Sequence, residues 1–115
     1  MSILSTMAVA GSGARAASVA LGAVAHNVAN LNTDGFQASR AVAREVAGGG
    51  VEARLAPTGA PTPMLLRDGE LVAGSNTDLV TETVNSAVAT ACYRVNLRML
   101  SEASSQIGTL LDIMG

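Results

Sequence analysis

Large side chains are scarce in this 115-residue sequence. Phe36 and Tyr93 are its only aromatic residues, and it has no tryptophan. Its apolar residues make up 49% of the chain and are mostly alanine, valine and leucine, which favours closely packed helices over a core built around large anchors. Two aromatic residues are also too few to form a platform on which nucleic-acid bases stack.

Charge is scarce as well, and it shows no basic excess. Charged residues are 14% of the chain, lysine is absent, and seven arginines against nine acidic residues leave a net charge of −2. Proteins that bind nucleic acid draw on basic residues that neutralise phosphates. We therefore expect no nucleic-acid partner.

Residues that carry chemistry are few. Cys92 and His26 are the only cysteine and histidine, so the chain offers no internal disulfide and no His/Cys ligand set for a metal. A Cys92–His26 hydrolase is the weakest alternative, because a lone cysteine at an apolar helical spacing is more typical of a small packed residue. The carboxylates are scattered, without a close pair for acid–base catalysis. We predict no enzyme, cofactor, metal or small-molecule substrate.

The distribution of proline divides the chain into three parts. All three prolines and a triple-glycine run lie within residues 32–76, whereas residues 3–31 and 77–114 are free of proline and follow a helical periodicity. We predict one domain over residues 1–115, of a mainly α fold class. Two long terminal helices should pair as a coiled coil or helical bundle around a small irregular or β-hairpin middle.

The first predicted helix has a regular apolar seam. Its members recur at steps of four and three, and they are Ile3, Met7, Ala10, Ala14, Ala17, Leu21, Val24, Val28 and Leu31. This seven-residue repeat is typical of a coiled-coil seam, and its central alanines let a partner helix approach closely. Arg15 interrupts the apolar stretch and no basic segment precedes it, so we expect neither a cleaved signal peptide nor a membrane span.

The second predicted helix begins after Asn76, which we expect to act as its N-cap. Its apolar stripe has a mean step of about 3.8 residues, nearer an eleven-residue than a seven-residue repeat. The stripe consists of Val80, Val84, Val88, Ala91/Cys92, Val95, Met99, Ala103, Ile107, Leu110 and Met114.

Turn signals organise the middle segment. Asp34-Gly35 predicts a turn after the first helix. Two hairpins are expected, residues 36–46 with 51–55 across the glycine run, and residues 64–66 with 70–72 around Asp68-Gly69. An alternative makes residues 37–46 helical.

Both helices carry more apolar surface than one partner helix covers. Beside the seam of the first helix lies a second stripe that includes Val9, Ala16 and Ala20, and a helix that is apolar nearly all round is a buried helix. Either the middle segment folds back as cover, or neighbouring subunits do. We favour neighbouring subunits, because the middle is rich in glycine and proline and has few large apolar side chains.

Residues 25–36, with the sequence Ala-His-Asn-Val-Ala-Asn-Leu-Asn-Thr-Asp-Gly-Phe, form the most distinctive polar segment. By residue chemistry alone, its asparagines indicate a helix stop followed by a turn. The segment also resembles the N-terminal signature A-N-N-I-A-N-x-N-T-x-G-[FY] of the axial proteins of the bacterial flagellum, from which His26 departs at the first asparagine and Val28 by a conservative change. Residues 75–82 resemble the family's N-V-D-L-x-x-E segment, residues 93–96 its A-Y-x-A-N, and residues 110–113 its closing segment.

The resemblance implies a structural subunit of the flagellar basal-body rod, most like a short proximal rod protein. Such a subunit is exported by the flagellar type III apparatus without a cleaved signal, and it self-assembles with other copies and with homologous rod subunits for motility. The implied assembly residues are Asn27, Asn30, Asn32, Thr33, Gly35 and Phe36 at the exit of the first helix, and Leu79, Tyr93, Asn96, Leu110 and Leu111 on the second. The alternative is a non-flagellar coiled-coil interaction module, such as an adaptor or export chaperone, which forms discrete oligomers.

Overall fold

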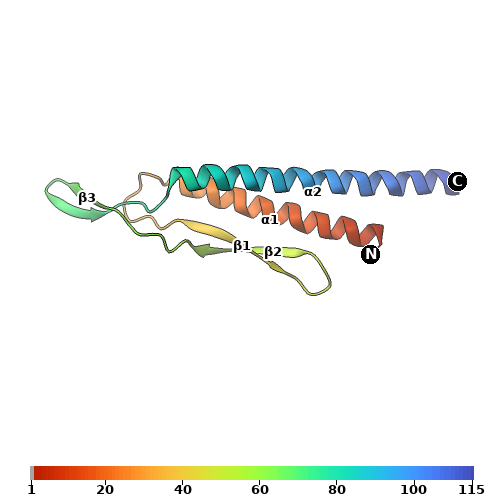
Figure 1. Cartoon of the computed structure of the whole chain (residues 1–115), viewed down its shortest axis with the longest axis horizontal. Coiled ribbons are helices and arrows are strands. Elements are labelled where there is room, and N and C mark those ends of the chain that lie inside the picture. Colours follow the sequence, from red (N-terminus) through yellow and green to blue (C-terminus); the bar gives the residue numbers. More distant parts are fainter. Residues whose placement is uncertain (1) are drawn as a thin grey trace.

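Two long antiparallel helices form the body of the protein in a computed structural model that describes residues 2–115 (Figure 1). Helix α1 spans Ile3–Ala29 with 27 residues, and α2 spans Leu79–Met114 with 36 residues. The molecule measures 77 × 24 × 15 Å along its principal axes. Because α2 is longer, its C-terminal turns project beyond the first turn of α1. Two long helices flanking a small middle segment were predicted, and this part of the prediction is confirmed.

The middle segment consists of two antiparallel hairpins. In the first, β1 (Ser39–Glu45) pairs with β2 (Val51–Pro57). In the second, β3 (Met64–Arg67) pairs with β4 (Glu70–Ala73). Both hairpins were predicted, and the helical alternative for residues 37–46 is wrong. The glycine run explains the outcome, since all three of its residues have positive φ, a conformation that reverses the chain without steric cost.

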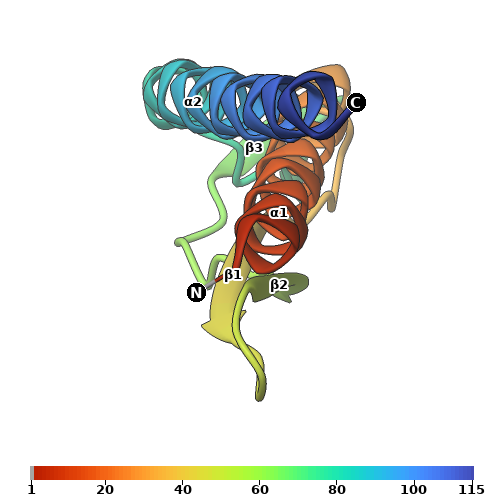
Figure 2. The ribbon, with the colours of Figure 1, turned by 90° about the vertical axis from the view of Figure 1, so that its right-hand side faces the viewer.

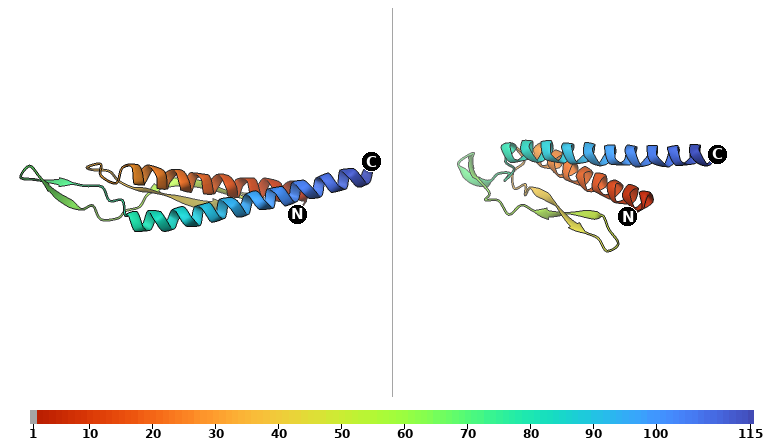
Figure 3. Two further views of the ribbon diagram at one scale, coloured as in Figure 1. Left: turned by 90° about the horizontal axis from the view of Figure 1, so that it is seen from above. Right: turned by 45° about the vertical axis from the view of Figure 1, so that its right-hand side comes forward.

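The elements stack in three layers, and α1 is the middle one. Figure 2 shows α2 on one side of α1 and the β1–β2 hairpin on the other. The β3–β4 hairpin projects from the end of the molecule where α2 begins, as both views of Figure 3 show. The middle segment thus covers one side of α1, which the sequence left open as an alternative to neighbouring subunits.

The core between these layers is built from small side chains. Its buried apolar residues are Ala10, Ala14, Ala17, Ala23, Ala38, Ala89 and Ala103. The most deeply buried large side chain is polar: Asn27 is 1% exposed. Alanine buries little apolar area per residue, so specific polar contacts carry more of the packing here than in a leucine-rich core.

Helix α2 presents a different face to α1 than the sequence predicted. Val80, Val84 and Val95 of the predicted stripe are 73%, 57% and 62% exposed. Apart from Thr90, the buried and half-buried positions of α2 recur at steps of four and three, and they are Glu82, Ser86, Ala89, Tyr93, Asn96, Leu100, Ala103 and Ile107. The predicted stripe and its eleven-residue period are therefore wrong for most of the helix. The reason lies in the first turns of α2, where the hydrogen bond from Asn27 to Glu82 turns Glu82 and Ala89 toward α1 and leaves the valines outside.

The C-terminal end of α1 and the N-terminal end of α2 also differ from the prediction. Helix α1 stops at Ala29 with Asn30 as its C-cap, two residues before the predicted end. Helix α2 starts at Leu79, and its N-cap is Asp78 in place of Asn76, with the Asp78 carboxylate accepting from the Val80 N–H at 3.1 Å.

By length and composition α1 is also able to cross a membrane, a test that packed helices and N-terminal signal sequences pass as well.

Candidate functional site at the exit of the first helix

The Asn27 side chain joins three elements of the fold. Its Nδ2 donates to the carbonyl oxygen of Ser39 at 2.7 Å and to Oε1 of Glu82 at 3.0 Å, while its Oδ1 accepts from the Ser39 N–H at 3.0 Å. The Asn27 carbonyl oxygen accepts from the Thr77 hydroxyl at 3.1 Å. One residue thereby ties the last turn of α1 to the start of β1, to the first turn of α2 and to the segment that precedes α2.

A second asparagine, Asn76, holds Ala38, the residue immediately before β1. Its Oδ1 accepts from the Ala38 N–H at 2.6 Å, and its Nδ2 donates to Gln37 Oε1 and to the Ala60 carbonyl oxygen, each at 3.1 Å. Asn76 is 7% exposed, so these bonds are formed largely out of water. Together, Asn27 and Asn76 bind consecutive backbone groups at the start of β1, and we call this arrangement the asparagine clasp.

Asn30 and Thr33 complete the exit of α1. The Asn30 Nδ2 donates to the His26 carbonyl oxygen at 2.9 Å, and the Thr33 hydroxyl donates to the Asn30 Oδ1 at 3.0 Å. A helix leaves its last carbonyl groups without intrahelical partners, and Asn30 satisfies one of them. Asn32 is exposed on the surface.

Gly35 and Phe36 guide the chain away from the helix. Gly35 has φ of +75°, which favours glycine, and its N–H donates to the Ala73 carbonyl oxygen at 2.8 Å. The Phe36 ring meets the His26 ring edge-on, with centroids 5.3 Å apart. The departure of His26 from the family signature thus places a second ring against the aromatic residue of the motif.

Glu82 is a buried carboxylate with one oxygen in use. The residue is 4% exposed, and its Oε1 accepts from Asn27. Its Oε2 has no hydrogen-bond partner among residues 2–115. The carboxylate lies in the first turn of α2, where the free N–H groups of the helix favour negative charge. A buried acceptor that lacks a partner is costly.

Glu82 also lines a groove of about 530 Å³ between α1, α2 and the β1–β2 hairpin. The groove follows α1 from Gly13 to Val24, and Ser39 and Glu82 contribute to it near the asparagine clasp. Alanine is the commonest residue in its walls, which also include Arg40, Asn85 and Asn96; the alanines are Ala16, Ala17, Ala20, Ala23, Ala41, Ala43, Ala53 and Ala89. The exposed thiol of Cys92 lines it too.

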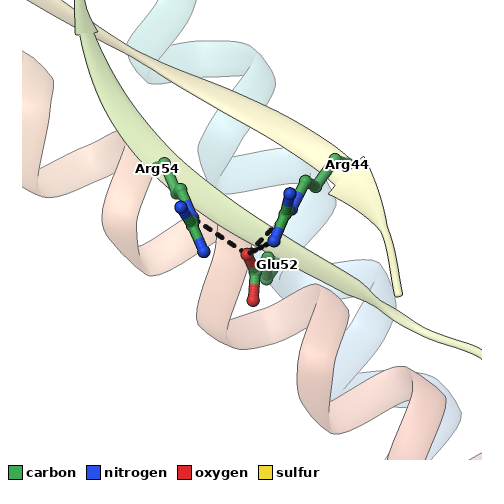
Figure 4. A network of polar contacts seen from close by, with 3 residues as sticks. All are labelled: Arg44, Glu52 and Arg54. Carbon is green, nitrogen blue, oxygen red and sulfur yellow. Dashed lines mark hydrogen bonds and ion pairs between the residues drawn. The ribbon is translucent and has the colours of Figure 1, made fainter. Parts of the chain in front are cut away.

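The β1–β2 hairpin carries a small ionic cluster on its surface (Figure 4). Glu52 Oε1 lies 2.7 Å from Arg44 Nη2 and 2.9 Å from Arg54 Nε. Hydrogen bonds from these two arginines, Arg44 first, lower the pKa of the Glu52 carboxyl below its usual value. Within residues 2–115, no group of three or more His, Cys, Asp or Glu side chains gathers in a way that would hold a metal ion.

The predicted residues of α2 fall into two groups. Tyr93 and Asn96 are half-buried on the face turned toward α1. Leu79, Leu110 and Leu111 are 51%, 49% and 63% exposed. Asn76 and Glu82 were missed as site residues, although both belong to the C-terminal segment that resembles the flagellar axial proteins.

Comparison with known proteins agrees with the motif. Residues 7–37, which comprise most of α1 and the motif through Phe36, match the family described as flagella basal body rod protein. The matched segment is 31 of the 115 residues, so the chain is similar to this family over its N-terminal part. This similarity supports a structural role in the flagellar rod, in assembly with other rod subunits. No curated protein matches the chain.

Proposed function

We propose that this protein is a structural subunit of the flagellar rod that assembles through its terminal helices into a helical axial structure serving motility. The observation that carries the proposal is the asparagine clasp. Asn27, within the matched family segment, fixes the angle between α1, β1 and α2 through hydrogen bonds to Ser39 and Glu82. A subunit that repeats along an axis needs its surfaces held in one fixed arrangement.

The exposed apolar surface of α2 supports assembly. Val80, Val84, Val88 and Val95 are each more than half exposed, and Ile113 and Met114 on the projecting turns are 77% and 82% exposed. Monomeric soluble proteins rarely leave contiguous apolar surface of this kind in water. Other copies of the chain and homologous rod subunits are the partners that would cover it.

The proposal has three finer parts. The helices pair as a coiled coil, which the four-and-three spacing of the buried positions on α2 supports. The chain is exported by the flagellar type III apparatus without a cleaved signal. Its place in the periplasm-spanning rod is that of a short proximal rod protein. The last two parts rest on the family resemblance alone.

The motif provides a test of incorporation with a matched control. We expect the variant Asn27→Ala plus Asn30→Ala to remain soluble but to be absent from isolated basal bodies, because both residues set the exit of α1. Asn32→Ala, a change of the same kind at an exposed position of the motif, should be incorporated normally. Circular dichroism at the growth temperature distinguishes failed assembly from unfolding. Incorporation of the folded double variant at the wild-type level would defeat the proposed role of the motif.

A further inference from the structure

The outer edge of β1 carries unpaired backbone groups. In an antiparallel ladder, alternate residues of a strand exchange hydrogen bonds with the partner strand, and the residues between them direct their N–H and C=O groups the other way. At the turn, the Val46 N–H donates to the Gly50 carbonyl oxygen at 3.0 Å. At the open end, the Thr58 N–H donates to the Ala38 carbonyl oxygen at 3.0 Å. Even-numbered residues of β1 therefore bond to β2. Its odd-numbered residues direct their backbone groups outward, and they are Ser39, Ala41, Ala43 and Glu45.

The Asn27 side chain takes the place of a third strand at the first of these positions. Its amide accepts from the Ser39 N–H at 3.0 Å and donates to the Ser39 carbonyl oxygen at 2.7 Å. These are the two bonds that a residue of a neighbouring antiparallel strand would make. The next outward residues, Ala41 and Ala43, have no such partner within residues 2–115. A ladder on this edge is thus begun by Asn27 and left open beyond it.

The open positions face the groove between β1 and α2. Ser39, Ala41 and Ala43 line this groove. Because Asn27 also bonds to Glu82, the edge of β1 is turned toward α2 at this end. No Cα atom of β1 lies within 8 Å of a Cα atom of α2, whereas neighbouring strands of a sheet lie about 4.8 Å apart. The groove, with its volume of about 530 Å³, supplies the room for one added strand.

The surroundings of the edge select the side chains of that strand. Residues opposite Ala41 and Ala43 would point into the groove, where alanines of α1 and β2 leave space only for small side chains. Residues opposite the even-numbered positions would point the other way, because side chains alternate along a strand. Arg40 occupies one of these positions, is exposed, and forms no ion pair with any residue that the structure describes. An acidic side chain opposite Arg40 would make a favourable cross-strand pair.

We infer that the edge of β1 accepts an extended segment of a partner protein as a third strand, with small side chains toward the groove and an acidic side chain beside Arg40. In strand addition of this kind, backbone hydrogen bonds give affinity and alternate side chains give specificity. The hairpin gains as well, because two strands alone are marginally stable. This inference goes beyond the proposed function, and its test uses the isolated chain, so either of the two can fail without the other.

Titration of the full chain with a designed peptide tests for the added strand. The probe is acetyl-Ala-Thr-Ala-Val-Ala-Glu-amide, and its reversed sequence is used alongside so that both strand directions are sampled. One of the two should bind and, at saturation, slow hydrogen exchange of the Ala41 and Ala43 amides at least about tenfold. The Leu55 amide, on the other edge of the hairpin, should not change. Failure of both peptides to bind at about 5 mM would overturn the inference, as would binding that leaves the Ala41 and Ala43 amides unprotected.

A backbone-modified peptide separates strand addition from side-chain binding. The probe with N-methylated alanines keeps every side chain but loses the donors that would meet the carbonyl oxygens of Ala41 and Ala43. It should not bind at the concentration that saturates the parent peptide. Equal affinity of the two peptides would contradict a third strand.

Two proline variants locate the bound strand. Proline lacks an N–H and is tolerated in a sheet where that N–H points away from the neighbouring strand. Ala43→Pro removes an outward donor of β1, and Leu55→Pro removes an outward donor of β2. The first should raise the Kd of the peptide at least about tenfold, and the second should leave it within about twofold. Protection of the Val42 amide, which bonds to β2, reports an intact hairpin in both variants. Equal effects on the Kd would contradict binding at the edge of β1.

A charge exchange tests the acidic side chain. Arg40→Glu should raise the Kd about fivefold, and it should bind the probe with lysine in place of glutamate more tightly than the parent probe. Arg94→Glu makes the same change at an exposed arginine of α2 that does not line the groove, and it should leave the Kd unchanged. Equal effects of the two variants would refute the pairing with Arg40.

Discussion

Replacing Asn27 by alanine should be the most damaging single polar substitution in this chain. The change removes two donated hydrogen bonds, to the Ser39 carbonyl oxygen and to Glu82 Oε1, and one accepted bond from the Ser39 N–H. Asn27 is 1% exposed, so these three hydrogen bonds are formed largely out of water. Glu82 would then be a buried carboxylate without a single side-chain partner among the described residues.

The expected cost follows from the groups left unpaired. A buried donor or acceptor that loses its partner costs about 1–3 kcal/mol, and more for a charged group. Some of these groups regain water when the alanine leaves space, so we expect a total of about 3–5 kcal/mol. Domains of this size are stable by about 5–15 kcal/mol, and the substitution therefore removes a large part of the folding free energy.

Urea denaturation followed by circular dichroism measures this loss. Asn30→Ala is the matched control, because it removes two exposed hydrogen bonds from the same motif and should cost about 1 kcal/mol. An Asn27→Ala cost within about 1 kcal/mol of the control would refute the reasoning, because it would mean that the clasp is satisfied equally well by water.

Three further substitutions test other parts of the fold. Gly13→Ala should destabilise the protein, although alanine normally favours a helix, because the added Cβ collides with the Asn96 side-chain amide. The Cβ of Gly22→Ala meets nothing within 4 Å, so this substitution should stabilise the helix by about 0.5–1 kcal/mol. Thermal unfolding compares the two variants. The pKa of Glu52, read from its carboxyl carbon by NMR, should lie below the usual value of a glutamate and should rise in Arg44→Ala. Because folding lowers the pKa of Glu52, the ion pair stabilises the protein fully at pH values above the pKa of Glu52 in the unfolded chain. This stabilisation is lost as the pH falls through the pKa of Glu52 in the folded protein. Arg44→Ala should therefore make the free energy of unfolding depend less on pH in the acid range.

The backbone plan of this protein could be predicted because its signals are local. Proline-free periodic segments indicate the two helices, and the glycine run and Asp68-Gly69 indicate the two hairpin turns. In the structure, Asp68 has φ of +50° and Gly69 has φ of +83°. Each of these features depends on residues that are close together in the sequence.

The packing could not be predicted in the same way, because it depends on distant residues. Apolar periodicity selected the valines of α2 as its inner face, whereas the alanine surface of α1 accepts Glu82 and Ala89. The hydrogen bond between Asn27 and Glu82 joins residues 55 positions apart, and that between Asn76 and Ala38 joins residues 38 positions apart. Asn76 would make a good N-cap by local rules, but its side chain is engaged by the start of β1.

The rod role is tested most directly by quantitative mass spectrometry of purified hook–basal bodies from cells that make this protein. The account predicts peptides of this chain in near-stoichiometric amounts relative to known rod subunits. Detection of the chain only in the soluble fraction of flagellated cells, as dimers or tetramers whose size does not change with concentration, would contradict it and favour an adaptor or export chaperone.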